Sequence, residues 1–319
     1  MVKPKYSIII PVYNRPLEVE ELLESLTKQT FANFEVVLVE DGSSITCEKV
    51  FEKYVGKLAL QYYFKPNTGP GPSRNFGFQK AKGEYFVVFD SDCIIPKHYF
   101  ENVESFLERT PLDAWGGPDR AHEDFTSLQR AMAYTMSSFL TTGGIRGGRL
   151  KGFQPRSFNM GIRKEVFGKT GGFKFDRLAE DIEFSIRMKK AGFEVGLIPE
   201  AFVYHKRRTN FKQFYKQVFN FGRGRVLVGK VHPGEIKITH WFPSLFLLGF
   251  VFSLLFLLLE PTLGNLFLTV YGLYFLGIFA HSLLVNKSFE VSALSLPSAA
   301  IQLIGYGTGF LQEKFKSHI

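Results

Sequence analysis

Hydrophobic residues along the first hundred positions fall into short runs rich in Ile, Val and Phe, separated by longer stretches with the spacing of amphipathic helices. Short apolar runs bounded by polar residues, Gly or Pro are typical of buried strands. The predicted strands are residues 7–12, 34–39, 60–64 and 85–89, and the predicted helices are residues 17–29, 46–55 and 72–82. This alternation predicts an α/β fold in which helices cover both faces of a mostly parallel sheet.

The last 79 residues have a different pattern, because long stretches of them contain no charged side chain. Residues 241–259 and 261–286 are 19 and 26 residues without Asp, Glu, Lys or Arg, and about 20 apolar residues suffice for a helix to cross a bilayer. We therefore expect two membrane-spanning helices, with a pair of buried core helices as the alternative. A third uncharged stretch, residues 291–311, contains Pro297 and several polar side chains, so it either spans the membrane, re-enters it or lies at its surface.

The positive charge is concentrated immediately before these stretches. Residues 201–240 carry nine basic residues and one acidic residue, which accounts for +8 of the net charge of +9. Apolar and basic residues alternate there at helical spacing, as in a helix that lies on an anionic membrane surface. A nucleic-acid-binding patch is the alternative, but such a patch need not adjoin a membrane helix, so we expect no nucleic-acid partner. The residues concerned are Phe211, Lys212, Phe214, Tyr215, Lys216, Val218, Phe219 and Arg223.

These patterns predict three parts: a globular domain at residues 1–205, a basic amphipathic segment at 206–240, and a membrane region at 241–319 with two to three hydrophobic helices. The apolar run near the N-terminus is short and interrupted by Pro11, unlike the hydrophobic region of a signal peptide. Positive charge beside a membrane helix marks the cytoplasmic side. We therefore expect a multi-pass protein of the cell inner membrane whose globular domain faces the cytoplasm.

Composition narrows the class of protein further. With 45% hydrophobic and 22% charged residues among 319, the chain is neither disordered nor collagen-like and is able to bury a core. Its two cysteines, Cys47 and Cys93, provide no disulfide framework and lack the paired spacing of a zinc site. This cysteine content suits a reducing compartment.

Polar residues with candidate chemistry follow the predicted strands, at the carboxyl ends where parallel sheets bind ligands. Asp90 and Asp92 follow an apolar strand, and two carboxylates one residue apart suit Mg²⁺ or Mn²⁺ bound to a diphosphate. An Asp-x-Asp pair alone usually marks a solvated turn, but a preceding buried strand favours the metal site. Asp41 ends the second strand, where it either accepts hydrogen bonds from a base or ribose or caps the next helix.

Three further candidates lie outside these strand ends. Arg74, near the start of a predicted helix, either binds a phosphate or faces solvent. Asp181, in the pair Glu180-Asp181, begins another predicted helix, where the helix dipole alone favours acidic residues. His205 follows a predicted strand at residues 201–204, and a single His is more often structural than functional.

Seven motifs, in this order, resemble those of family 2 glycosyltransferases, and the resemblance extends over about residues 5–206. They are Ser7-Ile-Ile-Ile-Pro-Val-Tyr-Asn14, Glu40-Asp-Gly-Ser43, Gly71-Pro-Ser-Arg-Asn75, Lys82-Gly-Glu-Tyr85, Asp90-Ser-Asp92, Gly171-Gly-Phe173 and Glu180-Asp181. The resemblance implies a GT-A fold, a nucleotide-sugar donor, a divalent metal, Mg²⁺ or Mn²⁺, and inversion at the anomeric carbon.

The resemblance also implies roles for individual residues. Those expected to bind the donor are Pro11, Tyr13 and Asp41 at the nucleoside, Arg74 near the diphosphate, Asp90 near the ribose and donor sugar, and Asn159 at the sugar. Asp92 is expected to bind the metal, helped by His205. Asp181 is expected to be the general base that deprotonates an acceptor hydroxyl.

Together these features predict a membrane-bound inverting glycosyltransferase. We expect it to move a sugar to an acceptor hydroxyl, on a lipid-linked saccharide of a bacterial cell-surface glycan, with the donor, a lipid-linked or saccharide acceptor and membrane lipids as partners. One alternative is a polyprenyl-phosphate glycosyltransferase, whose ionised phosphate acceptor needs no base such as Asp181. A nucleotide-sugar-binding membrane protein without turnover is another, although Asp92 and Asp181 are both present. A nucleotidyltransferase would gain nothing from membrane helices.

Overall fold

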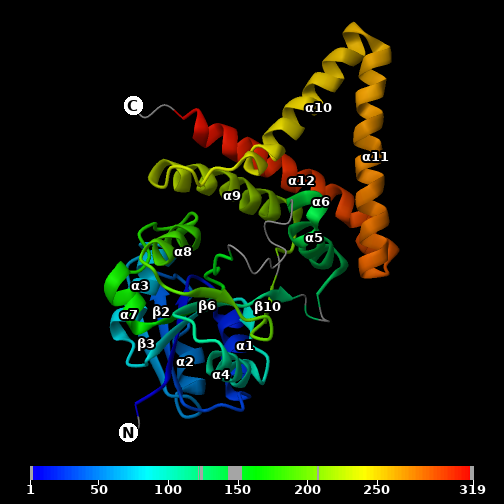
Figure 1. Cartoon of the computed structure of the whole chain (residues 1–319). Helices are drawn as coiled ribbons and strands as arrows, with labels where there is room; N and C mark the ends of the chain where they lie inside the picture. Colours follow the sequence, from blue (N-terminus) through cyan, green and yellow to red (C-terminus); the bar gives the residue numbers. More distant parts are fainter. Residues whose placement is uncertain (1–2, 121, 123–124, 143–152, 207, 317–319) are drawn as a thin grey trace. The chain divides into compact units, whose positions relative to one another are not determined.

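The computed structural model describes residues 3–120, 122, 125–142, 153–206 and 208–316. The chain divides into two compact units. The first is formed by Met1–His122 and Leu150–Lys206, and the second by Glu123–Arg149 and Arg207–Ile319. The strands all belong to the first unit, and the described elements of the second are helices (Figure 1).

A seven-stranded sheet forms the centre of the first unit, in the order β3-β2-β1-β4-β8-β6-β9. Its strands are β1 (Tyr6–Val12), β2 (Phe34–Asp41), β3 (Leu60–Lys65), β4 (Tyr85–Phe89), β6 (Ala114–Gly116), β8 (Asn159–Arg163) and β9 (Val195–Leu197). The strands β1 to β4 are parallel, β8 is antiparallel to both β4 and β6, and β9 is parallel to β6. The predicted α/β fold with a mostly parallel sheet is therefore confirmed.

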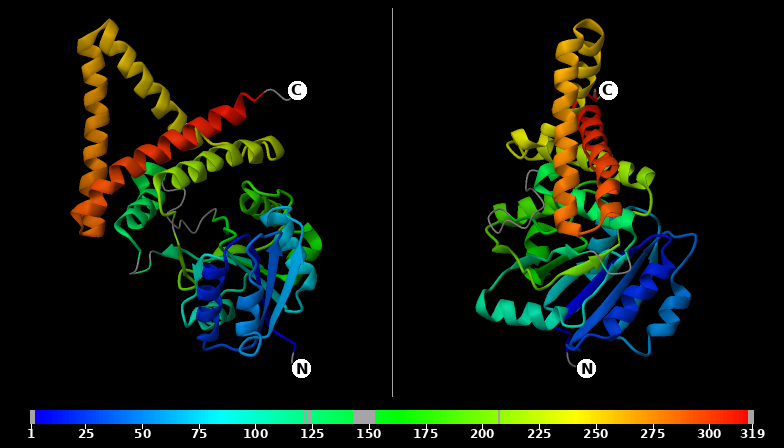
Figure 2. Two further views of the ribbon diagram at one scale, coloured as in Figure 1. Left: turned by 180° about the vertical axis from the view of Figure 1, so that it is seen from behind. Right: turned by 90° about the vertical axis from the view of Figure 1, so that its right-hand side faces the viewer.

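Helices cover both faces of this sheet (Figure 2). Ile8 and Ile10 of β1 pack in one core with α1, α2 and α4, whereas Ile9 between them packs in a second core with α3, α7 and α8. Because neighbouring residues of a strand point to opposite faces, the three consecutive isoleucines of β1 contribute to both cores. The helices are α1 (Pro16–Thr27), α2 (Glu48–Tyr54), α3 (Pro70–Lys80), α4 (Tyr99–Arg109), α7 (Lys164–Thr170) and α8 (Glu180–Lys190).

A small sheet of three short strands lies beside the carboxyl end of β4. Its order is β5-β10-β7, with β5 (Cys93–Ile94), β10 (Val203–His205) and β7 (Asp119–Arg120). In the antiparallel pairing of β10 with β5, His205 lies opposite Cys93. This pairing brings His205 next to the residue that follows Asp92.

The second unit consists of helices that pack around α12. They are α5 (Ser127–Ser137), α6 (Phe139–Thr142), α9 (Phe211–Val231), the 3₁₀ turn η1 (Ile238–His240), α10 (Phe242–Leu259), α11 (Pro261–Asn286) and α12 (Phe289–Lys314). The helix α12 contacts α5, α9, α10 and α11. A Cβ atom at Gly222 of α9 would lie 2.2 Å from the carbonyl oxygen of Tyr306, and one at Gly309 of α12 would lie 2.1 Å from that of Phe219. Glycines therefore allow α9 and α12 to approach closely, as small residues do between membrane helices.

Two helices, α10 and α11, are long and apolar enough to cross a membrane (Figure 1). Their most apolar segments have mean hydropathies of 2.5 and 1.7, and 11% of each segment is buried. The Tyr271 hydroxyl of α11 donates a hydrogen bond to the carbonyl oxygen of Phe246 in α10 at 2.7 Å. Core helices of a soluble protein would be mostly buried, so this exposure argues against the alternative of two buried core helices.

One segment within the predicted boundary of the globular domain lies in the second unit. Residues 127–142 fall inside the predicted globular domain 1–205, but α5 and α6 belong to the second unit, where Met132 and Met136 pack with residues of α9. The third hydrophobic stretch, for which the sequence left three membrane positions open, forms α12, which is not one of the two candidate spans. This helix contains small polar residues, such as Ser295, that are buried against neighbouring helices. These polar residues make α12 less apolar than α10 and α11.

The predicted amphipathic segment corresponds mainly to α9, and part of its predicted apolar face was assigned wrongly. Phe214 and Val218 do not face outward, because they are buried with Met132 and Met136 of α5. Tyr215 is exposed, and so are Lys212 and Lys216. The surface of α9 that is open to a ligand or membrane is therefore narrower and more basic than the sequence pattern implied.

Candidate active site

Three neighbouring strands end at one edge of the large sheet. The loop after β1 carries Arg15, β2 ends at Asp41, and Asp90 and Asp92 follow β4. Because β1 is parallel to both β2 and β4, these carboxyl ends point in the same direction. The structure thus places the predicted aspartates at the edge where sheets of this kind bind ligands.

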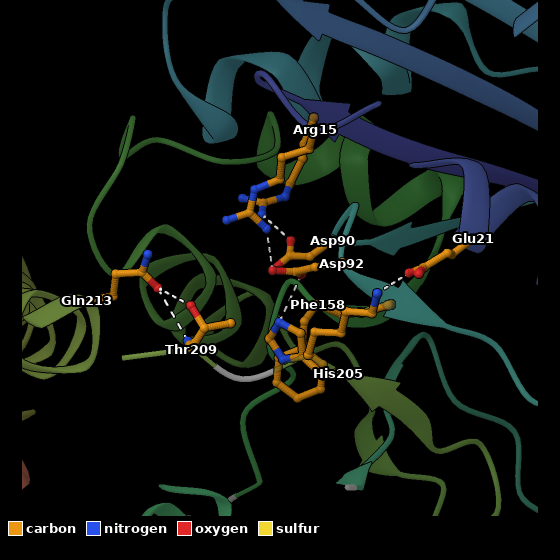
Figure 3. A network of polar contacts seen from close by, with 11 residues as sticks. Arg15, Glu21, Asp90, Asp92, Phe158, His205, Thr209 and Gln213 are labelled. Atoms are coloured by element: carbon orange, nitrogen blue, oxygen red, sulfur yellow. Dashed lines mark hydrogen bonds and ion pairs between the residues drawn. The ribbon is translucent and has the colours of Figure 1, made fainter. Parts of the chain in front are cut away.

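Asp92 lies between two basic side chains, Arg15 and His205 (Figure 3). His205 Nε2 is 3.1 Å from Asp92 Oδ1, and the Arg15 guanidinium pairs with the other oxygen, Oδ2. The Phe158 ring stacks on the imidazole of His205, with their centroids 5.0 Å apart. Stacking and the β5–β10 pairing together fix the imidazole beside the carboxylate.

The donor atoms at this point suit a divalent cation. One possible ligand atom from each of Asp92, Cys93 and His205 lies within 4.8 Å of the others. The Cys93 thiol donates to the carbonyl oxygen of Phe158, and burial followed by the nearby Asp92 raises the pKa of Cys93, so the neutral thiol is the poorest ligand of the three. His205 Nδ1 is buried and has no hydrogen-bond partner among the described residues. A carboxylate with an imidazole fits Mn²⁺ or Mg²⁺.

Arg74 is enclosed between two carboxylates. Its Nη1 donates to Glu180 Oε1 at 2.9 Å and its Nη2 to Asp90 Oδ1 at 2.8 Å, and the residue is 3% exposed. The guanidinium lies inside the protein, and the role of Arg74 near the diphosphate of a donor stays a prediction. Arg74 connects the end of β4 to the start of α8.

Glu180, beside Asp181, depends on that contact. Burial raises the pKa of Glu180, and the positive charge of Arg74 acts in the opposite direction. A buried carboxylate without a cation would be costly, so Arg74 stabilises the ionised form of Glu180.

Asp181 begins α8 and is held by backbone groups. Ile182 N donates to Oδ1 at 2.7 Å, and Ser157 N donates to Oδ2 at 3.4 Å. Arg156 Nη1 lies 3.9 Å from Oδ1. Amide hydrogens and the helix N-terminus favour the negative charge of the carboxylate, which remains partly exposed. A partly exposed, ionised carboxylate in a fixed position is able to accept a proton.

The loop that leads to Asp181 is fastened to α3. The Asn75 amide makes two hydrogen bonds of 2.8 Å to the backbone of Phe173, one in each direction. The Gly71 amide donates to the carbonyl oxygen of Asp176 at 3.0 Å. The Gly71–Asn75 motif therefore positions the segment that carries Glu180 and Asp181.

The Asp41 carboxylate is engaged in hydrogen bonds and an ion pair with neighbouring residues. Its carboxylate accepts hydrogen bonds of 2.9 Å from the amides of Thr68 and Gly69 and pairs with Lys65. Burial raises the pKa of Asp41, but the Lys65 ammonium and these amides outweigh burial and hold the pKa below its ordinary value. Asp41 thus organises the turn at residues 66–69. Tyr13, with 53% of its surface exposed, is more accessible to a ligand than Asp41. Pro11 at the end of β1 is half-buried.

The assignment of Asn159 to the donor sugar stays a prediction, and the structure shows this side chain in the interior. Asn159 is fully buried, its Oδ1 accepts a hydrogen bond from the Tyr99 hydroxyl at 2.6 Å, and its Nδ2 donates to the carbonyl oxygen of Ala201 at 2.7 Å. Both ends of the amide are satisfied inside the protein. Asn159 therefore joins β8 to the segment before β10.

Two residues that shape this site were missed by the sequence analysis. Arg15 pairs with Asp92, and Lys65 pairs with Asp41. Both follow strands that were predicted correctly, so basic residues just after the strands were the available signal. Which carboxylate each would meet depended on packing between distant segments.

The model of glycosyl transferase family 2 matches residues 7–171 of the chain. The chain belongs to this family.

An uncharacterized glycosyltransferase of Haemophilus influenzae is 31% identical over 216 residues, which cover 64% of this chain and 70% of that protein. The poly(ribitol-phosphate) beta-N-acetylglucosaminyltransferase TarS of Staphylococcus aureus is 39% identical over 113 residues, 34% of this chain and 20% of TarS. The first curated relatives are matched over only 15% to 20% of their own length.

Solved structures have the same fold. The mannosyltransferase PcManGT from Pyrobaculum calidifontis, in complex with GDP-Man and Mn²⁺, aligns with a TM-score of 0.63 over 99% of this chain and 88% of its own, at 15% identity. Residues 1–349 of S. aureus TarS in complex with UDP-GlcNAc align with a TM-score of 0.51 over 97% of this chain and 91% of that one, at 22% identity. These likenesses confirm the expected GT-A fold.

Proposed function

We propose that this protein is an inverting glycosyltransferase that moves a sugar from a nucleotide-sugar donor to an acceptor hydroxyl. The observation that carries the proposal is a pair of separate carboxylate centres in the first unit. One centre is Asp92 with His205, which suits a cation, and the other is Asp181 at the start of α8, which suits a base. Arg74 connects the surroundings of the two through Asp90 and Glu180. Family membership and the donors in the complexes of PcManGT with GDP-Man and of TarS with UDP-GlcNAc support this proposal.

On the donor side, Asp92 and His205 would hold Mg²⁺ or Mn²⁺, with Asp90 nearby. The cation would supply positive charge against the departing nucleoside diphosphate. Tyr13 follows β1 and offers an exposed ring for the nucleoside. Pro11 lies in the same strand, and Asp41 ends the neighbouring strand β2. These residues would orient the donor, and a cation held by Asp92 and His205 would bind its diphosphate end.

On the acceptor side, Asp181 takes the proton from the attacking hydroxyl. Amides of Ile182 and Ser157 fix the carboxylate without removing its charge. A single displacement with the base opposite the leaving group inverts the anomeric carbon.

A polyprenyl-phosphate glycosyltransferase has an acceptor that is already ionised, so it would not need Asp181 as a base. A binding protein without turnover would need neither carboxylate centre. Purified full-length protein tested with a panel of UDP- and GDP-sugars decides among them. We expect nucleoside diphosphate release with at least one donor, increased by a hydroxyl acceptor. Binding of donors without any release would favour the non-catalytic alternative, and release only with a polyprenyl phosphate would favour the other.

The second unit supports a membrane role for the same enzyme. We propose that residues 241–319 form the membrane region, in which α10 and α11 span the inner membrane of the cell, while the globular domain faces the cytoplasm. The exposure of apolar residues on both helices supports this placement. The acceptor is then a lipid-linked saccharide of a surface glycan, because the basic segment at 206–240 adjoins α10 and favours anionic lipid.

Replacing Lys212 and Lys216 with Gln is expected to impair transfer to a lipid-linked acceptor more than hydrolysis of the donor. Both lysines are exposed on α9 beside exposed Tyr215, and each basic residue near an anionic surface contributes roughly 1 kcal/mol. Together that is about a 30-fold effect on kcat/KM for the membrane-bound acceptor. Lys49→Gln with Lys82→Gln, two exposed lysines of the first unit, is the control with the same change in charge. Equal losses in transfer and hydrolysis would contradict the lipid-facing role.

Replacing Arg74 with Gln is expected to move the acidic limb of the pH–rate profile to higher pH. Arg74 lowers the pKa of Glu180 against the effect of burial, so without Arg74 this carboxyl becomes protonated at a higher pH and releases the start of α8. Diphosphate release measured from pH 5 to 9 reports the shift. Arg177→Gln, at an exposed arginine of the same loop, should leave the limb in place.

If Arg74→Gln does not fold, Arg74→Lys retains the charge and one of the two pairs. It should then give a smaller shift in the same direction. An acidic limb at the wild-type position in either folded variant would show that Arg74 has only a structural role.

A further inference from the structure

Arg15 occupies an unusual place in the site. It immediately precedes α1, whose first residue is Pro16, and its guanidinium pairs with Asp92 Oδ2 (Figure 3). The Arg15 side chain is 32% exposed, whereas that of Asp92 is 7% exposed. Arg15 therefore reaches from the surface down to the carboxylate that best suits a metal ion.

The two oxygens of Asp92 are divided between Arg15 and His205. A cation that coordinates this carboxylate would come next to the guanidinium, and two positive groups at that separation repel each other. Imidazole is different, because its neutral form is itself a metal ligand. His205 can therefore stay beside Asp92 when the cation binds, whereas Arg15 must lose its contact.

Arg15 also differs from the other arginine near these aspartates. Arg74 is 4% exposed at its side chain and is held by both Asp90 and Glu180, so it cannot change partners without opening the core. Arg15 pairs with the carboxylate of Asp92, and its side chain is 32% exposed, so it can turn toward solvent without opening the core. A guanidinium freed beside a metal-bound diphosphate would find phosphate oxygens, which it binds through two parallel N–H groups.

We propose that Arg15 is a diphosphate-binding residue that competes with the metal ion for Asp92 and moves to the donor's phosphates when the metal binds. The inference rests on the proposed function, since it assigns Arg15 to the diphosphate of the same donor. It makes metal and donor binding mutually dependent. The diphosphate draws Arg15 away from Asp92 and so strengthens metal binding, and by reciprocity the metal strengthens diphosphate binding.

The test measures binding rather than turnover, on full-length protein in detergent. Mn²⁺ alone is titrated by electron paramagnetic resonance, and UDP and GDP are titrated by calorimetry with and without Mn²⁺. For Arg15→Gln we expect Mn²⁺ alone to bind about tenfold more tightly, and the preferred nucleoside diphosphate to bind about tenfold more weakly in the presence of Mn²⁺. Lys28→Gln, which removes one positive charge at the other end of α1, should change neither affinity.

A second variant separates charge from geometry. Arg15→Lys keeps the positive charge beside Asp92 but loses the planar pair of donors, so Mn²⁺ alone should bind as in the wild type while diphosphate affinity falls. Unchanged or weaker Mn²⁺ binding in folded Arg15→Gln would overturn the competition. Unchanged diphosphate affinity in both variants would overturn the phosphate contact.

Failure of the proposed function has a different signature. In that case the wild type would bind neither UDP nor GDP in the presence of Mn²⁺. The titration with Mn²⁺ alone still decides whether Arg15 competes for Asp92.

Discussion

Replacing Asp181 with Asn is expected to lower sugar transfer by a factor on the order of 10² to 10⁴, the usual contribution of a general base. The amide has nearly the same shape as the carboxylate, so its oxygen can still accept the hydrogen bond from Ile182 N. It cannot take a proton from the acceptor hydroxyl. The affinity for the donor should stay near the wild-type value, because the contacts of Asp181 are with Ile182, Ser157 and Arg156 rather than with Asp92 or His205. Single-turnover transfer and donor binding measured side by side will separate the two quantities.

The matched control is Asp176→Asn. Asp176 lies in the same loop, is exposed, and contributes its backbone oxygen to the contact with Gly71. This control should retain transfer. If Asp181→Asn also retains it, the base lies elsewhere, and a parallel loss of donor affinity would mean that Asp181 acts on the donor instead. Glu180 is a poor substitute as base, since it is buried against Arg74.

The sequence was sufficient for the sheet because its central strands are buried on both faces. Such strands need runs of apolar residues, and β4 is apolar throughout while β1 and β2 contain the apolar runs 8–10 and 36–39. The ends of these strands could therefore be located, and with them Asp41, Asp90 and Asp92. The rule that parallel sheets bind ligands at their carboxyl ends then predicted the region of the site.

The partners of those side chains could not be predicted in the same way. Arg74 has a position near a helix start that suits a phosphate, yet the fold encloses it between Asp90 and Glu180. Asn159 lies in a motif next to the site, but β8 points its amide toward Tyr99. These choices depend on which residues distant in sequence meet, and no local pattern records that.

The helical unit shows a second limit of sequence patterns. An apolar stripe on a basic helix has the same spacing whether it faces lipid or protein, since both are apolar. Phe214 and Val218 in α9 were expected to face lipid and are buried against α5 instead. The pattern predicted an amphipathic helix correctly and could not identify what covers its apolar side.

Replacing Asp92 with Ala is expected to abolish turnover, with a loss above about 10³-fold, the upper range for removing one preorganised electrostatic group. The substitution removes the carboxylate shared by Arg15 and His205, and with it the best oxygen ligand for Mn²⁺ or Mg²⁺. The Arg15 guanidinium then lies there without its acidic partner, which also opposes a bound cation. Wild-type activity should disappear in excess EDTA and return with added Mn²⁺. The variant should not respond to Mn²⁺, and its direct titration with Mn²⁺ should show no site of wild-type affinity.

Asp176→Ala, at an exposed acid of the same unit, should behave as the wild type in both assays. Full activity of Asp92→Ala, or of the wild type in EDTA, would show that the departing diphosphate is stabilised by protein cations alone.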